Sequence, residues 1–170
     1  MEALRYYSDL DLATRTLAAA RWQNAVECPH CQSREKHFYI ATRRIWKCRS
    51  CRRQFSPKAG TIFEDSPIAA DKWLVTIWMV ANGGKPIPAD RLHRIVGVSQ
   101  TSARFMLRRI DLAMQSPQFT LLESTPLQPK ITRAELRGEK YRRFIRLLIA
   151  IAAVPKAAVY DPDPRPDLKS

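Results

Sequence analysis

Hydrophobic positions recur at helical spacing in the middle of the chain. Between Ala70 and Asn82 the large apolar residues share one helix face, and the glycines of "NGGKPIP" follow them, as is typical of a helix C-terminus. A short helix is predicted over about 88–95, with proline in its first turn. A third helix, over about 100–114, carries its apolar residues at core spacing: Ala103, Met106, Leu107, Ile110 and Met114.

The turn "VGVS" separates the last two of these helices. Gly97 can adopt a positive φ there, and Ser99 is placed as an N-cap. Three helices with a glycine turn before the third describe a helix-turn-helix, whose third helix enters the major groove N-terminus first. The alternative is a solvated basic helix in a protein that never binds DNA. We expect three side chains near base edges and two nearer phosphates: Gln100, Thr101 and Arg104, then Arg108 and Arg109.

The residues before these helices have a β-type pattern and contain every cysteine of the chain. The cysteines form two Cys-x2-Cys pairs separated by sixteen residues: Cys28, Cys31, Cys48 and Cys51. The spacer "KHFYIATRRIWKC" is rich in aromatic and β-branched residues and is broken at "TRR". It therefore predicts a two-stranded excursion that returns the second pair to the first.

Four thiolates at this spacing predict one structural metal ion. Zinc prefers four soft sulfur ligands at about 2.3 Å, and a closed shell leaves no position for a catalytic water. A rubredoxin-like iron site has similar ligands. Two disulfides or a redox pair are the other interpretation, which a reducing compartment disfavours.

Basic residues crowd around the second cysteine pair. From Lys36 to Phe63 there are eight Lys and Arg residues and no acid. They have two interpretations, which the sequence leaves open: they balance the charge of about −2 on a zinc tetrathiolate, or they also contact phosphate. The candidate DNA contacts in this segment are Arg43, Arg44, Lys47, Arg49, Arg52 and Arg53.

The whole chain is basic, with 29 Lys and Arg against 16 Asp and Glu among 170 residues and a formal charge of +13. Such a charge favours a polyanion: nucleic acid first, an anionic membrane surface second. The N-terminus lacks the pattern of a signal peptide, and the longest apolar run, 144–154, is about half the length of a membrane span. We expect a cytoplasmic, nucleoid-associated protein without a membrane span.

The last third of the chain predicts a linker and one helix. "SPQFTLLESTPLQPK" has three prolines and predicts a linker. In "TRAELRGEKYRRFIRLLIAIAAV", Thr132 and Glu135 form a capping box, and the second half is apolar on nearly every side. Such a helix needs covering, by packing on the helix-turn-helix, by a homodimer contact or by a membrane surface. A fourth interpretation is read-through sequence after a lost gene end.

Three runs in order resemble one known family: "LAAARWQNAVECPHC", "RIWKCRSCRRQFSPKAGTIFEDSPI" and "DKWLVTIWMVANGGKPIPADRLHRIVGVSQTSARFMLRRIDLAM". Together they look like the N-terminal half of the zinc-ribbon insertion-sequence transposases, over roughly 7–114. The resemblance implies a zinc ion on the four cysteines and recognition of transposon-end DNA by the ribbon and helices. Members of that family continue into an RNase H-like domain that holds two magnesium ions on acidic residues.

This chain departs from the family in its last third. Only 56 residues follow Met114, with six acids, three of them in the proline-broken "YDPDPRPD". We therefore expect no catalytic residues and no enzyme activity, but a zinc-dependent double-stranded DNA-binding protein of regulatory type. Two alternatives stand: the DNA-end-binding part of an active transposase whose catalytic part is elsewhere or lost, and a zinc-ribbon adaptor for proteins.

The expected fold class is α+β, mostly α. It consists of an N-terminal helix and a four-cysteine zinc ribbon over 1–64, a three-helix helix-turn-helix over 65–115, and a linker, C-terminal helix and proline-rich tail over 116–170.

Overall fold

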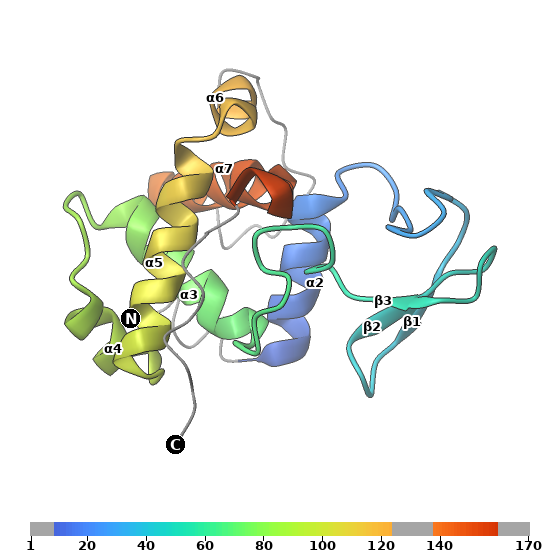
Figure 1. The fold of residues 1–170 in the computed structure, drawn as a ribbon, viewed down its shortest axis with the longest axis horizontal. Helices are drawn as coiled ribbons and strands as arrows, with labels where there is room; N and C mark the ends of the chain where they lie inside the picture. Colours follow the sequence, from blue (N-terminus) through green and yellow to red (C-terminus); the bar gives the residue numbers. More distant parts are fainter. Residues whose placement is uncertain (1–8, 124–137, 160–170) are drawn as a thin grey trace.

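The computed structural model describes residues 9–123 and 138–159. Within these ranges the protein is mostly helical, with six α-helices and one three-stranded sheet. In Figure 1 the sheet projects from one side of a helical body, and helix α2 lies between the two. The expected fold class, mostly α with a small four-cysteine ribbon, is confirmed.

The ribbon sheet is a small antiparallel meander of strands β1 (Phe38–Ile40), β2 (Ile45–Lys47) and β3 (Gln54–Phe55) in the order β1-β2-β3. Its register aligns three aromatic residues across one face, because Tyr39 pairs with Trp46 and Trp46 with Phe55. Directly opposed residues share a face, so the neighbouring row, Phe38, Lys47 and Gln54, lies on the other face.

The aromatic face of the sheet packs on helix α2 (Leu10–Arg21) and on Trp22, which follows it. The Trp22 ring lies 5.4 Å from that of Trp46 and 5.8 Å from that of Phe55, edge-on in both cases. The Tyr39 hydroxyl donates to Asp11, and this hydrogen bond, aided by Arg15, lowers the pKa of Asp11. The sheet is thereby fixed to α2 by edge-to-face contacts, an arrangement that pairs of aromatic rings prefer.

The opposite side of α2 contributes to the main hydrophobic core. Ala13, Leu17 and Ala20 are buried there with residues of α3 (Ala70–Asn82) and α7 (Glu139–Ala153). Asp9 caps helix α2, because its carboxylate accepts from the backbone N–H groups of Asp11 and Leu12. The expected first segment, 1–64, thus takes part in two hydrophobic clusters that share α2.

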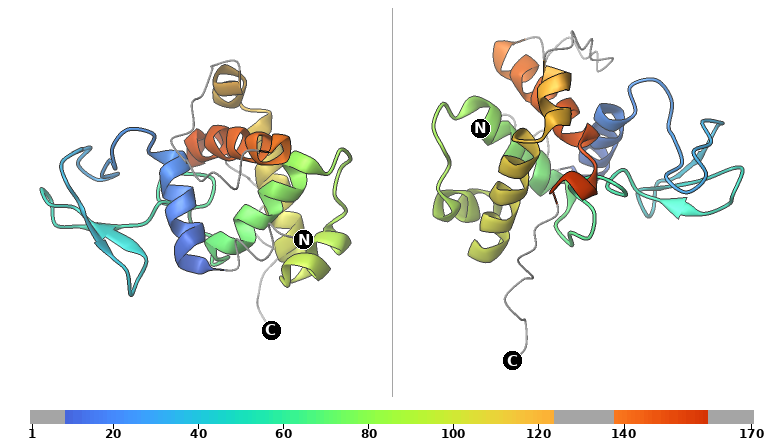
Figure 2. Two further views of the ribbon diagram at one scale, coloured as in Figure 1. Left: turned by 180° about the vertical axis from the view of Figure 1, so that it is seen from behind. Right: turned by 45° about the horizontal axis from the view of Figure 1, so that its top comes forward.

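Helices α4 (Ala89–Val96) and α5 (Gln100–Met114) lie at the end of the body away from the ribbon, as Figures 1 and 2 show. Gly97 between them has φ of 68°, in the left-handed region. The Ser99 hydroxyl accepts from the Ser102 N–H and caps α5. Both caps agree with the sequence prediction, and the helix bounds agree within a residue.

Residues 117–123, predicted as a linker, form helix α6 (Pro117–Glu123) instead. Ser116 caps it by accepting from the Phe119 N–H, Pro117 occupies the first helical position, and Phe119 is buried against the core. The linker prediction was wrong here because the proline begins a helix and does not break one. The predicted capping box of Thr132 and Glu135 lies outside the described residues.

The apolar helix predicted near the C-terminus is α7, and the chain itself covers it. Phe144, Ile145, Leu148 and Ile151 are fully buried among α2, α3 and α6, and Figure 2 shows α7 crossing these helices. Of the four interpretations of this helix, intramolecular packing agrees with the structure, although its partners are chiefly α3, α2 and α6. None of the helices in the described ranges has the length and apolar character needed to cross a membrane.

Candidate metal centre and basic surfaces

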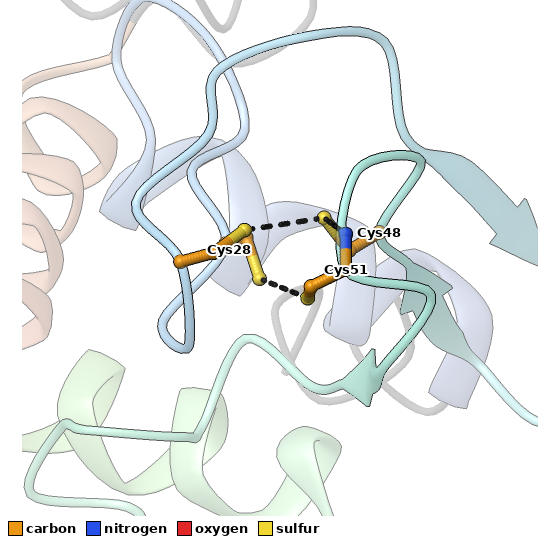
Figure 3. A group of neighbouring side chains, drawn as sticks. Cys28, Cys48 and Cys51 are labelled. Carbon is orange, nitrogen blue, oxygen red and sulfur yellow. Dashed lines mark hydrogen bonds between the residues drawn. The ribbon is translucent and has the colours of Figure 1, made fainter.

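The four cysteine sulfurs meet between the two loops that carry the cysteine pairs. Sγ of Cys28 lies 3.7 Å from that of Cys51, and Sγ of Cys31 lies 3.6 Å from that of Cys48. All four sulfurs fall within 4.8 Å of one another. Figure 3 shows Cys28 reaching from one loop toward Cys48 and Cys51 on the other.

These separations fit a tetrahedral metal ion and not a disulfide. Zinc–sulfur bonds of about 2.3 Å at tetrahedral angles place sulfurs about 3.8 Å apart, whereas a disulfide needs about 2.05 Å. All four cysteines are free thiols. The prediction of one ion held by Cys28, Cys31, Cys48 and Cys51 is therefore confirmed as geometry, and the disulfide interpretation is wrong.

The two cysteine loops repeat the same backbone construction. The N–H of Cys28 donates to the Ser33 carbonyl at 3.0 Å, and that of Cys48 donates to the Arg53 carbonyl at 2.9 Å. The residue after the second cysteine of each pair has positive φ, 58° at Gln32 and 59° at Arg52. Each loop therefore turns back on itself and directs both sulfurs to one point.

Two of the four thiols, Cys31 and Cys48, differ in how readily they ionise. Burial opposes the ionisation of Cys48, but the backbone N–H of Cys51, 3.4 Å from Sγ, and the neighbouring thiols lower its pKa to about 6. A backbone hydrogen bond at Ser33 favours the Cys31 thiolate, yet burial and the other thiols raise its pKa to about 11. Of these two thiols, Cys48 is thus the first to become a thiolate, the form that binds metal.

A metal ion held here would act structurally. Cys28 and Cys48 are buried beside Trp46 and Phe55 in a cluster of only five buried residues. That core is too small to hold the ribbon together unaided, so the ion would supply most of the cohesion. Four protein sulfurs would fill the coordination shell, and the site offers no chemistry beyond folding and charge.

The loop that leads from the ribbon to α3 is held by four cations: Lys58, Arg21, Lys156 and Arg109. Lys58 Nζ donates to the carbonyls of Ser66 (2.5 Å) and Ile68 (2.9 Å), and burial and the nearby Arg109 lower the pKa of Lys58. Arg21 Nη1 donates to the Pro57 carbonyl at 3.0 Å. Lys156, in the short 3-10 helix η2 (Lys156–Val159), pairs with Asp65. The role of Lys58 was not predicted from the sequence, although its isolation within the motif "SPKAGTIFE" could have signalled it.

Arg109 binds the same loop, contrary to its predicted place near phosphates. Its Nη1 donates to the carbonyls of Ile62 (2.5 Å) and Glu64 (2.7 Å), and the guanidinium lies 4.5 Å from the Phe105 ring centre. The side chain is half-buried. Because Arg109 immediately precedes the buried Ile110, it borders the apolar face of α5 and turns toward the loop.

The other predicted side chains on α5 are exposed. Four of the five lie on the surface of the helix: Gln100, Thr101, Arg104 and Arg108. The first two occupy its first turn, after the Ser99 cap. They are placed where a ligand could reach them.

Five of the six predicted basic residues on the ribbon are exposed: Arg43, Lys47, Arg49, Arg52 and Arg53. Arg49 lies between the cysteines of the second pair, and Arg52 and Arg53 follow them. Arg43, in the β1–β2 turn, donates through Nη1 to Gln54 Oε1 at 3.0 Å. Arg44 is half-buried with φ of 54° and contributes to the lowered pKa of Asp11. Arg44 is therefore partly directed toward α2.

Comparison with known protein families finds a match to the ribbon segment. Residues 11–54 match the transposase zinc-ribbon domain. That range joins α2 to the sheet and both cysteine pairs, which is the unit that packs together in the structure.

A curated relative extends beyond the ribbon. The chain is 27% identical over 130 residues to an uncharacterized protein in the transposable element ISH50 of Halobacterium salinarum. The alignment covers 75% of this chain but 44% of the relative, so the chain spans less than half the length of that protein. The comparison with solved structures found no significant match.

Proposed function

We propose that this chain is a zinc-dependent, double-stranded DNA-binding protein related to the N-terminal region of a transposase. The observation that carries the proposal is the cluster of four cysteine sulfurs inside the range that matches a transposase zinc-ribbon domain. The formal charge of +13 supports a polyanionic ligand. A regulatory role, association with the nucleoid and the absence of nuclease activity are parts of the same proposal.

Helix α5 is the proposed reader of the major groove. It follows a left-handed glycine turn after α4, and its first turn exposes Gln100 and Thr101. Side chains in the first turns of such a helix are placed to meet base edges, with Arg104 one turn further along. Arg108 would contact phosphate, whereas Arg109 is already bound to the loop carbonyls and has no part in the proposed interface.

The ribbon is the proposed second contact, through phosphates. Arg49, Arg52 and Arg53 are exposed on or beside the second cysteine loop, which the metal ion would keep rigid. In Figure 1 the β1–β2 turn and the corner between α4 and α5 extend toward the same lower edge of the molecule, on either side of α2 and α3. One duplex running along that edge would meet α5 and Arg43 in the β1–β2 turn, whereas the second cysteine loop leaves the opposite end of β2 and would contact phosphates further along the duplex.

A mobility-shift assay over a salt series tests the proposal. The metal-loaded protein is mixed with genomic DNA fragments, and the best-bound fragment is compared with random duplex. We expect a steep loss of affinity with salt, because each phosphate contact contributes about −0.9 to the slope of log K against log salt. No shift at low salt, or a flat salt response, would exclude the proposal.

Two arginine variants make the assay specific. Arg104→Ala, on α5, should weaken binding to the best fragment more than binding to random duplex. Arg142→Ala removes the same charge from the exposed side of α7 and serves as the matched control. Equal losses for both variants would show that only total charge matters and would contradict a reading role for α5.

The partial coverage of the ISH50 protein by this chain favours a second candidate function. Because the chain aligns with only 44% of that protein, it could be the DNA-end-binding part of a transposase whose catalytic part lies elsewhere. The downstream reading frame and the ends of any surrounding element distinguish the two. Preferred binding to inverted element ends, together with a catalytic domain encoded alongside, would favour this candidate over a regulator.

A further inference from the structure

The outer face of the ribbon sheet has a composition that its packing does not explain. Phe38, Lys47 and Gln54 form one row across the three strands, and Ile40 and Ile45 form the next. The side chain of Phe38 is 59% exposed. An exposed Phe ring is unfavourable in free energy, because its apolar surface stays in contact with water. The packing of the inner face of the sheet does not require an aromatic residue at this position.

The contrast with the inner face is informative. Tyr39, Trp46 and Phe55 are all used against α2 and Trp22. Phe38 is the aromatic residue of the strands that remains outside. Among the described residues it is also the most exposed large hydrophobic side chain, ahead of Ile95 at 39% and Met114 at 38%.

The surroundings of Phe38 are cationic. Its cross-strand partner is Lys47, and Lys36 precedes it by two residues. Arg43 reaches the far end of the same row, where it donates to the Gln54 side chain. No acidic residue occurs from Lys36 to Phe63. An exposed ring between cations matches a nucleic acid, whose bases stack on aromatic faces while phosphates meet Lys and Arg.

We propose that this outer sheet face binds unpaired bases of DNA, with Phe38 as the stacking platform and Lys47 as its phosphate contact. The inference rests on the proposed DNA-binding function and deepens it. Unpaired bases are favoured over intact duplex because the bases inside a duplex are stacked on one another and offer no free ring face to Phe38. The loop of a hairpin or a melted duplex end would expose such bases.

The test compares three DNA probes with the metal-loaded full chain. The probes are single-stranded oligothymidylate, a duplex with a short unpaired loop at its centre, and the same duplex fully paired. Phe38→Ala should weaken binding to the first two about 5- to 100-fold and leave the paired duplex unchanged. Phe38→Trp should restore binding, because it keeps a ring face.

Two further variants separate stacking from charge. Phe38→Ala removes no charge, so the slope of log K against log salt should stay the same. Lys47→Ala should instead reduce that slope by about 0.7–0.9. Met114→Ala, which shortens an exposed apolar side chain on α5, is the matched control and should change neither quantity. Zinc content and far-UV circular dichroism confirm that each variant is folded.

Each other outcome overturns the inference in a recognisable way. Equal affinity of Phe38→Ala and the unchanged protein for unpaired DNA excludes stacking. An equal loss on paired and unpaired probes makes Phe38 a duplex contact. A change in sedimenting mass caused by Phe38→Ala makes the face a contact between copies of the chain. Absence of binding to every probe removes the proposed function itself, and this inference with it.

Discussion

Arg109 and Ile62 are 47 positions apart in the sequence and are joined by a hydrogen bond of 2.5 Å from Nη1 of the arginine to the carbonyl of the isoleucine. The same Nη1 reaches the Glu64 carbonyl at 2.7 Å. Helix α5 is thus bound directly to the loop that follows the ribbon. The proposed reading helix and the proposed phosphate-binding ribbon are held in one fixed relation through this side chain.

Arg109→Met should therefore destabilise the fold without removing a DNA contact. Hydrogen bonds from a charged donor to partly buried carbonyls make the expected loss about 2–3 kcal/mol in the free energy of unfolding. Urea denaturation followed by fluorescence measures it. DNA affinity, measured where the variant remains folded, should stay within about twofold of the unchanged protein, a difference of about 0.4 kcal/mol.

Arg104→Met is the matched control on the same helix, since Arg104 is exposed. It should leave the free energy of unfolding within about 0.5 kcal/mol of the original and weaken DNA binding. The opposite assignment of effects, with Arg109 essential for binding and neutral for stability, would contradict the inward role of Arg109.

Metal removal should unfold the ribbon and spare much of the helical body. The ribbon cluster contains five buried residues, two of them cysteine ligands, whereas the main cluster is formed by residues of α2 to α7 and the 58–68 loop. A chelator, or Cys48→Ser, should abolish the near-UV signal of Trp22 and Trp46 and hydrogen-exchange protection over about 28–58. Thr42→Ala, at an exposed position of the β1–β2 turn, should change neither.

Protection in α3 and α7 should survive the same treatment. If α3 and α7 lose protection together with the ribbon, the two clusters form one cooperative unit. If the ribbon keeps its near-UV signal without metal, the structural role of the ion is refuted.

Metal affinity should fall as the pH is lowered, because metal binds the thiolates. The pKa of Cys48 is lowered to about 6, while that of Cys31 is raised to about 11. At neutral pH the set therefore still carries protons that the metal must displace. Calorimetry in buffers of different ionisation enthalpy should detect proton release on zinc binding. An affinity independent of pH between about 6 and 8 would contradict sulfur ligation.

Local patterns were sufficient to predict the helices other than α6, the turn between α4 and α5, and the metal ligands. Each of those features depends on residues close in sequence: Gly97 and Ser99 define the turn, and the doubled cysteine spacing defines the site. The prolines after Met114 predicted a linker, although Ser116 followed by Pro117 is the signal of a helix start and could have been read as one.

Contacts between distant segments could not be predicted in the same way. The hydrophobic pattern places Arg109 beside the apolar face of α5. It does not reveal that two backbone carbonyls of the loop accept hydrogen bonds from this side chain. Nor does it show that α2 has one side for the sheet and another for the main core. The hydrogen bonds of Arg109 and the two packing faces of α2 both depend on tertiary contacts between segments that are far apart in the sequence. Local spacing of residues does not specify such contacts.

Helix α7 should stabilise the single chain. Phe144 is fully buried, and its ring centre lies 5.3 Å from that of Trp78 on α3. Phe144→Ala should cost about 3–5 kcal/mol, measured by urea denaturation. Leu147→Ala, at a half-buried position of the same helix, should cost less.

The melting temperature should also not depend on protein concentration. Were α7 a dimer contact, as one interpretation of the sequence had it, dilution would lower the melting temperature. Sedimentation of the unchanged protein and of Phe144→Ala under native conditions provides the independent check.

Substitutions at the two positive-φ residues of the cysteine loops can distinguish an effect on stability from an effect on DNA binding. Gln32 and Arg52 occupy equivalent places, with φ of 58° and 59°, a conformation that costs a non-glycine residue about 1 kcal/mol. Gln32→Gly and Arg52→Gly should therefore both retain the fold and raise the free energy of unfolding by up to about 1 kcal/mol. Gln32→Val should lower it by a similar amount, because a β-branched residue tolerates this conformation poorly.

DNA binding should distinguish the two glycine variants. Both relieve the same backbone strain, but only Arg52→Gly removes a cation from the proposed phosphate-binding surface. Arg52→Gly should weaken duplex binding and reduce the salt slope by about 0.9, while Gln32→Gly leaves both unchanged. Equal slopes for the two variants would mean that the arginines beside the metal site only balance its negative charge, and the ribbon would then have to be removed from the proposed duplex interface.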